Sequence, residues 1–223
     1  MKTPIEWART SIHKRGWLKT LEIAMSTLVD IEFDLYYGTD TIRRVDMDSL
    51  EFESENKAHA VLYQATKTRP LRKLMRKLSV PKNGAFVDLG SGKGRALLVA
   101  MQLGFDKVIG VEFSPELCAV ARKNIEIFSS RLNSHSQVEI VESDVSKYQF
   151  NPHSNVFFMY NPFDKVVVDR MIENLRNSLL QSPRQIWLIY NTPVWAELLD
   201  NAGLFFHHQD FEIGGTKFRV YNN

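Results

Sequence analysis

The spacing of hydrophobic residues changes near residue 85. Before that point, residues 16–35 carry apolar side chains at alternating steps of four and three, which predicts a helix with one apolar face. The positions are Trp17, Leu21, Ala24, Leu28, Ile31 and Leu35. A second helix is predicted after Pro70, with apolar residues at Leu71, Leu74, Met75 and Leu78 and basic residues on its other side. We expect the first helix to cover a cleft or to pack on the domain, with partner or membrane-surface binding as the alternative.

From residue 85 onward, short apolar runs alternate with helical patterns. The predicted strands are AFVDL, KVIGVEF, QVEIVES, NVFFMYNPF and RQIWLIYN. Helices are predicted between them, and FFHHQDFEIGGTKFRVYNN predicts a hairpin around Gly214-Gly215. Such alternation builds a parallel sheet with helices on both faces, so the fold class is α/β, doubly wound and Rossmann-like. We expect a helical N-terminal extension over residues 1–57 and the main domain over residues 58–223.

Composition narrows the function classes only a little. The formal net charge of +2 argues neither for nor against nucleic acid, and the basic face of the helix after Pro70 is typical of a solvated surface. The single cysteine, Cys118, excludes an intrachain disulfide and a cysteine-based zinc site, and no spacing of histidines and acids predicts a metal. Without an apolar run long enough for a membrane span or a secretory signal, we expect a cytoplasmic protein.

The stretch FVDLGSGKGR carries the clearest chemistry. Asp88 closes an apolar strand, and Gly90, Gly92 and Gly94 follow before a helix, so the backbone can approach a ligand closely and offer free N–H groups. The next strand ends in Glu112, at the distance from the glycines where dinucleotide folds place a ribose-binding acid. The spacing G-x-G-x-G differs from the G-x-G-x-x-G of nicotinamide enzymes. The pattern predicts a nucleoside-containing ligand.

Four stretches together resemble a known family. FVDLGSGKGR, VIGVEFSPELCAVARKN, ESDVSKY and YNPF are similar to the successive motifs of class I S-adenosylmethionine-dependent methyltransferases. The resemblance spans roughly residues 58–223. It implies a seven-stranded sheet whose last strand is antiparallel, and S-adenosylmethionine as the cofactor.

The resemblance also implies which residues hold that cofactor. The glycines would lie against its methionine portion, Asp88 would hold the loop or the ammonium group, and Glu112 would bind the ribose hydroxyls. Asp144 with Val145 would meet the adenine, and aromatic rings such as Phe113 would face the sulfonium. Tyr63 and Thr66 belong to a stretch similar to a segment that closes over the ligand, with simple packing as the alternative. The full set is Tyr63, Thr66, Asp88, Gly90, Ser91, Gly92, Gly94, Glu112, Phe113, Asp144, Val145 and Asn161.

The acceptor side is predicted at Asn161-Pro162-Phe163, which ends the fourth strand of the alternating region. It is similar to the Asn/Asp-Pro-Pro-aromatic motif of nitrogen methyltransferases but lacks the second proline, and a strand end with a capping Asn is the alternative. Residues 190–193 either line the acceptor cleft or form a plain strand end. Asp164 is more typical of a helix cap than of a base, and His207 and His208 are typical of an exposed strand.

These patterns favour a methyltransferase that acts on a nitrogen of a protein side chain, lysine in particular, or of a small molecule. Protein lysine is included because of a looser likeness to lysine methyltransferases of the same fold. An RNA or DNA base methyltransferase and a non-catalytic nucleoside-binding regulatory domain are the alternatives. The acceptor and the oligomeric state are left open.

Overall fold

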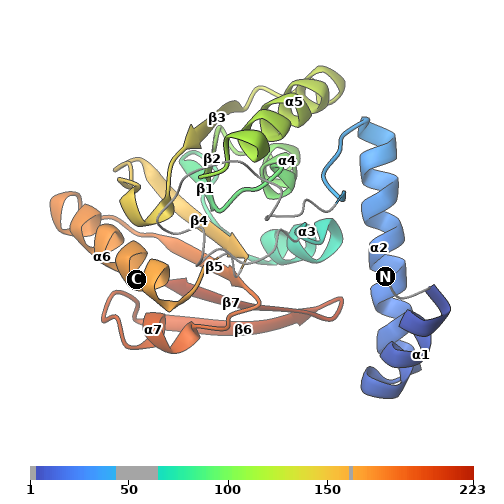
Figure 1. The fold of residues 1–223 in the computed structure, drawn as a ribbon. Coiled ribbons are helices and arrows are strands. Elements are labelled where there is room, and N and C mark those ends of the chain that lie inside the picture. The colour runs from blue at the N-terminus through green and yellow to red at the C-terminus, as the bar shows by residue number, and fades with distance from the viewer. Residues whose placement is uncertain (1–3, 44–64, 161–162) are drawn as a thin grey trace.

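The computed structural model describes residues 4–43, 65–160 and 163–223 and forms a sheet flanked by helices, with a long N-terminal helix along one side (Figure 1). The strands are β1 (Ala85–Leu89), β2 (Lys107–Glu112), β3 (Gln137–Glu142), β4 (Ser154–Tyr160), β5 (Trp187–Asn191), β6 (His207–Ile213) and β7 (Thr216–Asn222). The helices are α1 (Pro4–Arg15), α2 (Trp17–Tyr37), α3 (Thr68–Lys77), α4 (Arg95–Gln102), α5 (Pro115–Leu132), the 3-10 turn η3 (Val145–Lys147), α6 (Lys165–Gln181) and α7 (Ala196–Asp200). The predicted boundary between residues 57 and 58 lies outside the described residues.

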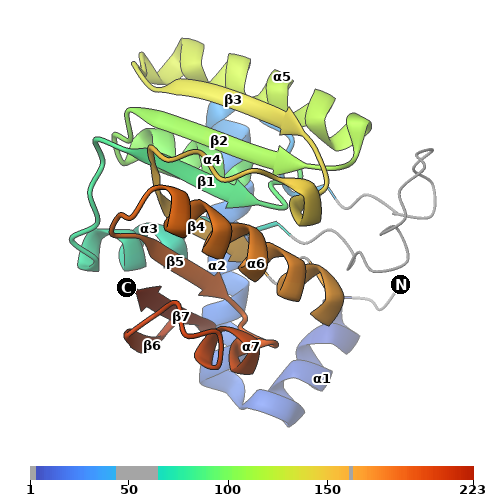
Figure 2. The ribbon, with the colours of Figure 1, turned by 90° about the vertical axis from the view of Figure 1, so that its left-hand side faces the viewer.

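The seven strands form one sheet in the order β3-β2-β1-β4-β5-β7-β6. The first five strands in chain order are parallel, whereas β7 is antiparallel to both β5 and β6 (Figure 2). This confirms the predicted doubly wound sheet with an antiparallel last strand. The strand order reverses between β1 and β4, and open α/β sheets bind ligands at the carboxyl ends of the strands beside such a point.

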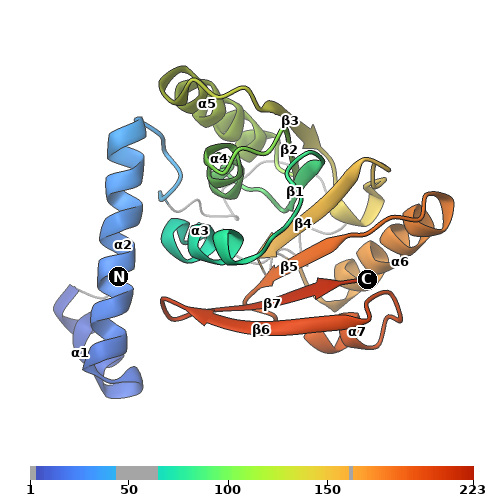
Figure 3. The ribbon, with the colours of Figure 1, turned by 180° about the vertical axis from the view of Figure 1, so that it is seen from behind.

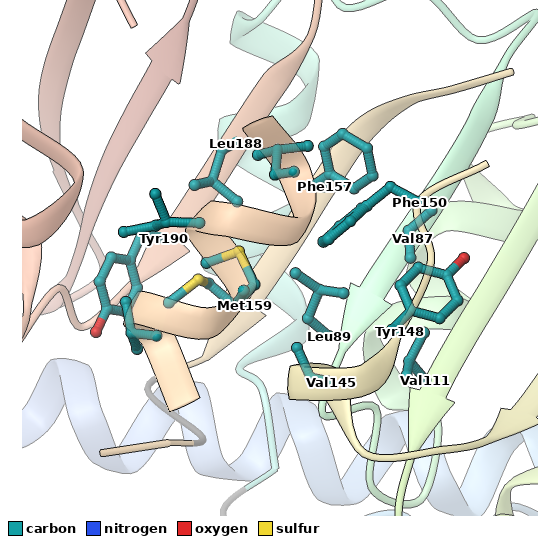
Figure 4. Close-up of a cluster of buried hydrophobic side chains, with 14 of the residues drawn as sticks. Val87, Leu89, Val111, Val145, Tyr148, Phe150, Phe157, Met159, Leu188 and Tyr190 are labelled. Carbon is teal, nitrogen blue, oxygen red and sulfur yellow. The ribbon is translucent and has the colours of Figure 1, made fainter. Parts of the chain in front are cut away.

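Helices cover both faces of the sheet, so the central strands are buried on both sides. Successive residues of β4 show this, because Phe157 and Met159 point into one core and Val156 and Phe158 into the other. Figure 4 shows the first core, in which side chains of β1, β2, β4 and β5 gather beside α6. The second core lies under α3, α4 and α5.

The helix caps predicted from the sequence are present in the structure. The Ser114 hydroxyl accepts a hydrogen bond from Leu117 N at 3.2 Å and so caps α5. Asp164 caps α6, because its Oδ1 accepts from Val166 N at 3.0 Å and from Val167 N at 3.2 Å. Asp164 therefore has the structural role that its position predicts. Among the described residues, no helix combines the length and the hydropathy that crossing a membrane requires.

Helix α2 forms where predicted, but its apolar face points the other way. Trp17 is 64% exposed and Leu28 is 58% exposed, whereas Asp30 is 2% exposed and faces the domain. The helix therefore packs on the domain and borders a cavity, as expected, but it does so through its polar face. Figure 3 shows α2 lying outside α3 and the β6–β7 hairpin, with α1 packed against one end of it.

The reason is a buried cluster of charges between α2 and the start of α4. The Arg95 guanidinium lies 3.5 Å from Asp30 Oδ1 and 3.2 Å from Asp34 Oδ2, and its side chain is 2% exposed. Asp30 also accepts a hydrogen bond from Thr68 N at 3.0 Å and pairs with Lys67 at 3.1 Å. Buried charges need such partners, so the polar face of α2 is held inward.

Replacing Arg95 with methionine tests this cluster. We expect Arg95→Met to lower the free energy of unfolding by about 3–5 kcal/mol, because Asp34 would then lose its cation and the buried Asp30 would keep only Lys67. Chemical denaturation measures the change. The control is Lys107→Gln, whose partner Glu139 lies 3.3 Å away with both side chains largely solvated, and which should cost less than about 1 kcal/mol. An equally small effect of both substitutions would contradict the role of Arg95.

Candidate functional site

The glycine loop between β1 and α4 folds back on the end of β2. Gly90 N and Ser91 N both donate to Val111 O, at 2.9 and 3.0 Å. Gly90, Gly92 and Gly94 have φ angles of 81°, 52° and 86°, in the left-handed region that favours glycine. The three glycines are therefore required by the backbone path itself, as their spacing predicts.

Glu112 holds this loop from the end of β2. Its carboxylate is buried, and Oε2 accepts a hydrogen bond from Gly92 N at 2.8 Å. Oε1 accepts from Phe113 N and Ser114 N, each at 3.0 Å. An ionised carboxylate offers about four acceptor positions, so a position is left for a ligand hydroxyl. Glu112, which is predicted to bind the ribose, thus also holds the two loops around the site.

Asp88 and Glu112 form a pair of buried acids at the carboxyl edge of the sheet. Burial raises the pKa of Asp88 well above its ordinary value, and the nearby Glu112 carboxylate raises it further. Burial also raises the pKa of Glu112, against the opposing effect of the three backbone N–H donors. A cation placed beside this pair would stabilise the ionised forms.

Two further features show that the loop fits a closely held polar ligand. The Ser91 hydroxyl is buried and has no hydrogen-bond partner among the described residues. Gly110 on β2 lies directly behind it, because a Cβ there would come within 2.7 Å of both Ser91 Oγ and Leu97 Cδ1. An orphaned hydroxyl, a tight backbone cradle and paired acids together fit an adenosyl amino acid.

The other predicted cofactor residues lie in different settings. Asp144 caps η3, since its Oδ1 accepts from Ser146 N at 2.8 Å, and Val145 beside it is buried. Phe113 is half-buried at the end of β2, and Thr66 is buried. Phe163 is buried in the core beside α6. The predicted positions Tyr63, Asn161 and Pro162 lie outside the described residues.

Asn124 and Lys93 lie near the glycine loop and were not singled out from the sequence. The side chain of Asn124 on α5 accepts from Asp40 N at 2.9 Å and donates to Lys93 O at 3.0 Å. Lys93 Nζ, in turn, lies 3.1 Å from Asp40 Oδ2. These contacts tie the segment after α2 to the glycine loop. They join residues that are far apart in the chain, so no local pattern in the sequence predicts them. The only local sign of close packing in the sequence was Gly110, inside the strand KVIGVEF.

A cavity of about 870 Å³ opens at the same edge of the sheet, and none of the residues that line it belongs to the glycine loop. Tyr160, at the end of β4, and Thr192, just after β5, form its floor, and Ile23 and Ser26 of α2 form a wall. The β6–β7 hairpin closes the remaining side. β4 pairs with β1 through Met159 and Leu89, so the cavity begins one strand from the glycines.

The polar groups of this cavity are mostly neutral or paired. Burial raises the pKa of Tyr160, although its hydrogen bond with Thr192 lowers it, so the phenol stays protonated near neutral pH. At the rim, the Arg219 guanidinium lowers the pKa of Asp210, and Glu212 lies 3.4 Å from Lys19.

Of the predicted acceptor-side residues, Thr192 and Pro193 line the cavity, whereas Tyr190 is buried in the core and accepts a hydrogen bond from Trp195 N at 3.2 Å. His207 and His208 are exposed on β6, as predicted. No cluster of histidine, cysteine and acids suited to a metal ion occurs in the described part of the chain.

Solved structures with this fold are methyltransferases and their relatives. A putative O-methyltransferase from Nostoc punctiforme is 13% identical with a TM-score of 0.57, covering 70% of this chain and 56% of that one. The pyocyanin biosynthetic protein PhzM is 16% identical with a TM-score of 0.56, covering 69% and 54%. A SAM-dependent methyltransferase from Aquifex aeolicus is 16% identical with a TM-score of 0.54, covering 68% and 88%. The chain thus spans about half the length of the first two. The fold is that of class I S-adenosylmethionine-dependent methyltransferases.

A family model narrows this class. The model described as histone methylation protein DOT1 matches residues 43–172, more than half of the chain. The protein therefore belongs to the DOT1 family, which confirms the predicted class, and S-adenosylmethionine is the cofactor of that class. A comparison with curated protein sequences gives no match.

The buried acids make stability depend on pH. The folded pKa of Asp88 is above its unfolded value, so between the two the folded state binds more protons and the free energy of unfolding falls as pH rises. Through that window we expect a slope of up to about 1.4 kcal/mol per pH unit from this group, which Asp88→Asn should remove. Urea unfolding of the ligand-free protein from acidic to neutral pH measures it. Glu112, whose pKa is also raised, keeps its own contribution, so the slope should become smaller in Asp88→Asn without vanishing. Asp169→Asn, on the exposed face of α6, should keep the wild-type slope; an undiminished slope in Asp88→Asn would refute this account.

Proposed function

We propose that this protein transfers a methyl group from S-adenosylmethionine to a nitrogen, and that the acceptor is a lysine side chain of a protein. The observation that carries the proposal is the cavity at the carboxyl edge of the sheet, one strand from the glycine loop, in a member of a histone methylation family. The cavity is lined by both polar and apolar side chains, and we propose that it receives a long side chain from a partner protein.

The cofactor would be held by groups already in place. Asp88 faces the position of the ammonium, and Glu112 the ribose hydroxyls, while the N–H groups around Gly94 at the start of α4 suit the carboxylate. Asp144 and Val145 border the adenine position. The bound cofactor supplies a methyl group activated by its positive sulfur. The protein's own task is to align the acceptor and to exclude water.

The acceptor amine must arrive without its proton, because only the neutral form has a lone pair to offer. The cavity lining contains two acidic side chains, Asp210 and Glu212, and three basic ones, Lys67, Lys217 and Arg219, so a lysine side chain would enter it without a net attraction by charge. Deeper in, burial beside the neutral Tyr160 favours release of the proton to solvent. Asn161, Pro162 and Phe163, which follow directly on β4, are proposed to orient the amine.

A transfer assay separates this proposal from its alternatives. The protein is incubated with methyl-labelled S-adenosylmethionine and, in parallel, with core histones, a lysine-rich peptide, total RNA and duplex DNA. We expect label on protein lysine with matching release of S-adenosylhomocysteine. Label on a nucleobase would establish the base methyltransferase instead. Cofactor binding without transfer to any of these acceptors would favour a regulatory domain.

Asn161→Ala tests the acceptor motif in the same assay. We expect transfer to fall at least about a hundredfold, as when one group that positions a reacting atom is lost, with cofactor affinity nearly unchanged. Asn201→Ala, at an exposed position after α7, is the matched control and should retain activity. Equal losses of transfer and of cofactor affinity in Asn161→Ala would contradict a role in orienting the acceptor.

Glu112→Gln tests the cofactor site. An amide keeps one acceptor oxygen but directs an NH₂ group at backbone N–H donors, so the glycine loop loses support and the ribose loses a charged acceptor. We expect the Kd for S-adenosylhomocysteine to rise at least tenfold, about 1.4 kcal/mol, by calorimetry. Glu139→Gln on β3, whose side chain is 54% exposed, should leave the Kd unchanged. Tight binding by a folded Glu112→Gln protein would remove Glu112 from the site.

A further inference from the structure

The outward face of α2 is a continuous apolar surface on a helix that otherwise belongs to the domain. Large apolar side chains lie along it, each at least 40% exposed: Trp17, Leu21, Leu28, Ile31 and Leu35. Leu18 and Met25 flank this row and, with Leu21, border a pocket against Pro70 of α3, while α1 packs on another side of α2. Apolar patches of this extent on folded proteins mark interaction sites. The domain itself cannot cover this one, because the buried contacts of Arg95 with Asp30 and Asp34 hold the opposite face inward.

The spacing of the patch identifies the kind of surface that fits it. Trp17, Leu21, Ala24, Leu28, Ile31 and Leu35 follow one another at steps of four and three over the whole of α2. A strict alternation of this kind is the seam of two helices packed as a coiled coil, narrower and more regular than the face of a helix lying on a sheet. The occupant indicated by the pattern is therefore another helix of similar length.

We propose that the outward face of α2 is a dimer interface, on which α2 of a second copy of this chain packs antiparallel about a twofold axis. The apolar positions form a self-consistent set of layers in that arrangement. Trp17 faces Leu35 of the second copy, Leu21 faces Ile31, and Ala24 faces Leu28, with each pair repeated across the axis. An isologous interface of this kind uses the same patch on both copies.

Charge decides the direction of the second helix. Helix α2 has no acidic residue in its first turn and no basic residue in its last, so its dipole is not offset by its own ends. Glu32 lies beside the stripe near the C-terminal end, and exposed Lys14 precedes the N-terminal end. Antiparallel packing brings Glu32 to the positive end of the second helix, whereas parallel packing would place Glu32 against Glu32.

The inner face of α2 connects the proposed interface to the cavity. Ile23 and Ser26 form a wall of the cavity beside Tyr160, so a second helix packed on the outside would hold that wall in place. The interface itself depends only on the exposed stripe and on the buried charges. It stands or falls independently of which methyl acceptor the protein uses.

Paired cysteines test both the contact and its direction. In the double variant Leu21→Cys/Ile31→Cys, we expect oxidation to give a covalent dimer, because each new cysteine faces the other type in the second copy. Within one helix these positions are about 15 Å apart, beyond the reach of a disulfide. The only native cysteine, Cys118, is buried. Either single variant should stay monomeric on a denaturing gel, since its copies lie far from each other across the axis.

Each outcome of the cysteine experiment either supports or contradicts the proposal. Covalent dimers from the single variants would mean parallel helices, and no covalent dimer from the double variant would mean no such contact; either result overturns the proposal. Light scattering of the full chain supplies a second measurement, in which the wild type should be dimeric and Leu28→Glu monomeric, with circular dichroism showing that the variant keeps its native secondary structure. Leu180→Glu, at a 74% exposed position on α6, should remain dimeric. A wild type that is monomeric, or that binds anionic vesicles as a monomer, would likewise overturn it.

Discussion

The buried guanidinium of Arg95 is the constraint on which the arrangement of this molecule depends. It lies between two carboxylates of α2 at the first residue of α4, directly after the glycine loop. A buried charge must be paired, so this contact determines which face of α2 meets the domain. The orientation of α2 then determines the wall of the acceptor cavity and leaves an apolar seam facing outward. Cofactor loop, acceptor cavity and proposed interface are thus connected through one side chain.

On the cofactor side, too, an acidic side chain has hydrogen-bond partners within the protein before any ligand binds. This residue is Glu112. Glu112 accepts three backbone hydrogen bonds and so builds the loop that it is proposed to share with the cofactor. Asp88 beside it is held at a raised pKa by burial and by that neighbour. Such a pair is poorly satisfied until a cation arrives, which favours a ligand that carries an ammonium group. The free protein is in this sense organised for its cofactor.

The cavity proposed for the acceptor has fewer specific features than the cofactor site. Those that it has would affect how an acceptor enters more than how it reacts. Each carboxylate that lines the cavity has a basic neighbour, Lys19 for Glu212 and Arg219 for Asp210. The proposed chemistry asks little more of it, because an activated methyl group requires alignment and dryness rather than a strong base. The proposed acceptor, a side chain presented by another protein, rests on the match to a histone methylation family and on the presence of this cavity.

The sequence by itself determined the α/β alternation, the antiparallel hairpin, the caps at Ser114 and Asp164, and the glycine loop with its acid at Glu112. Those features are local, since each is encoded by periodicity, by a capping residue or by a spacing within one strand–helix–strand unit. The tertiary structure alone decided that Asp30 points inward, that Ser26 and Tyr160 share a cavity, and that Gly110 must lack a side chain. These depend on pairings between residues far apart in the chain, and the amphipathic pattern of α2 says that two faces differ but not which one the domain will bury.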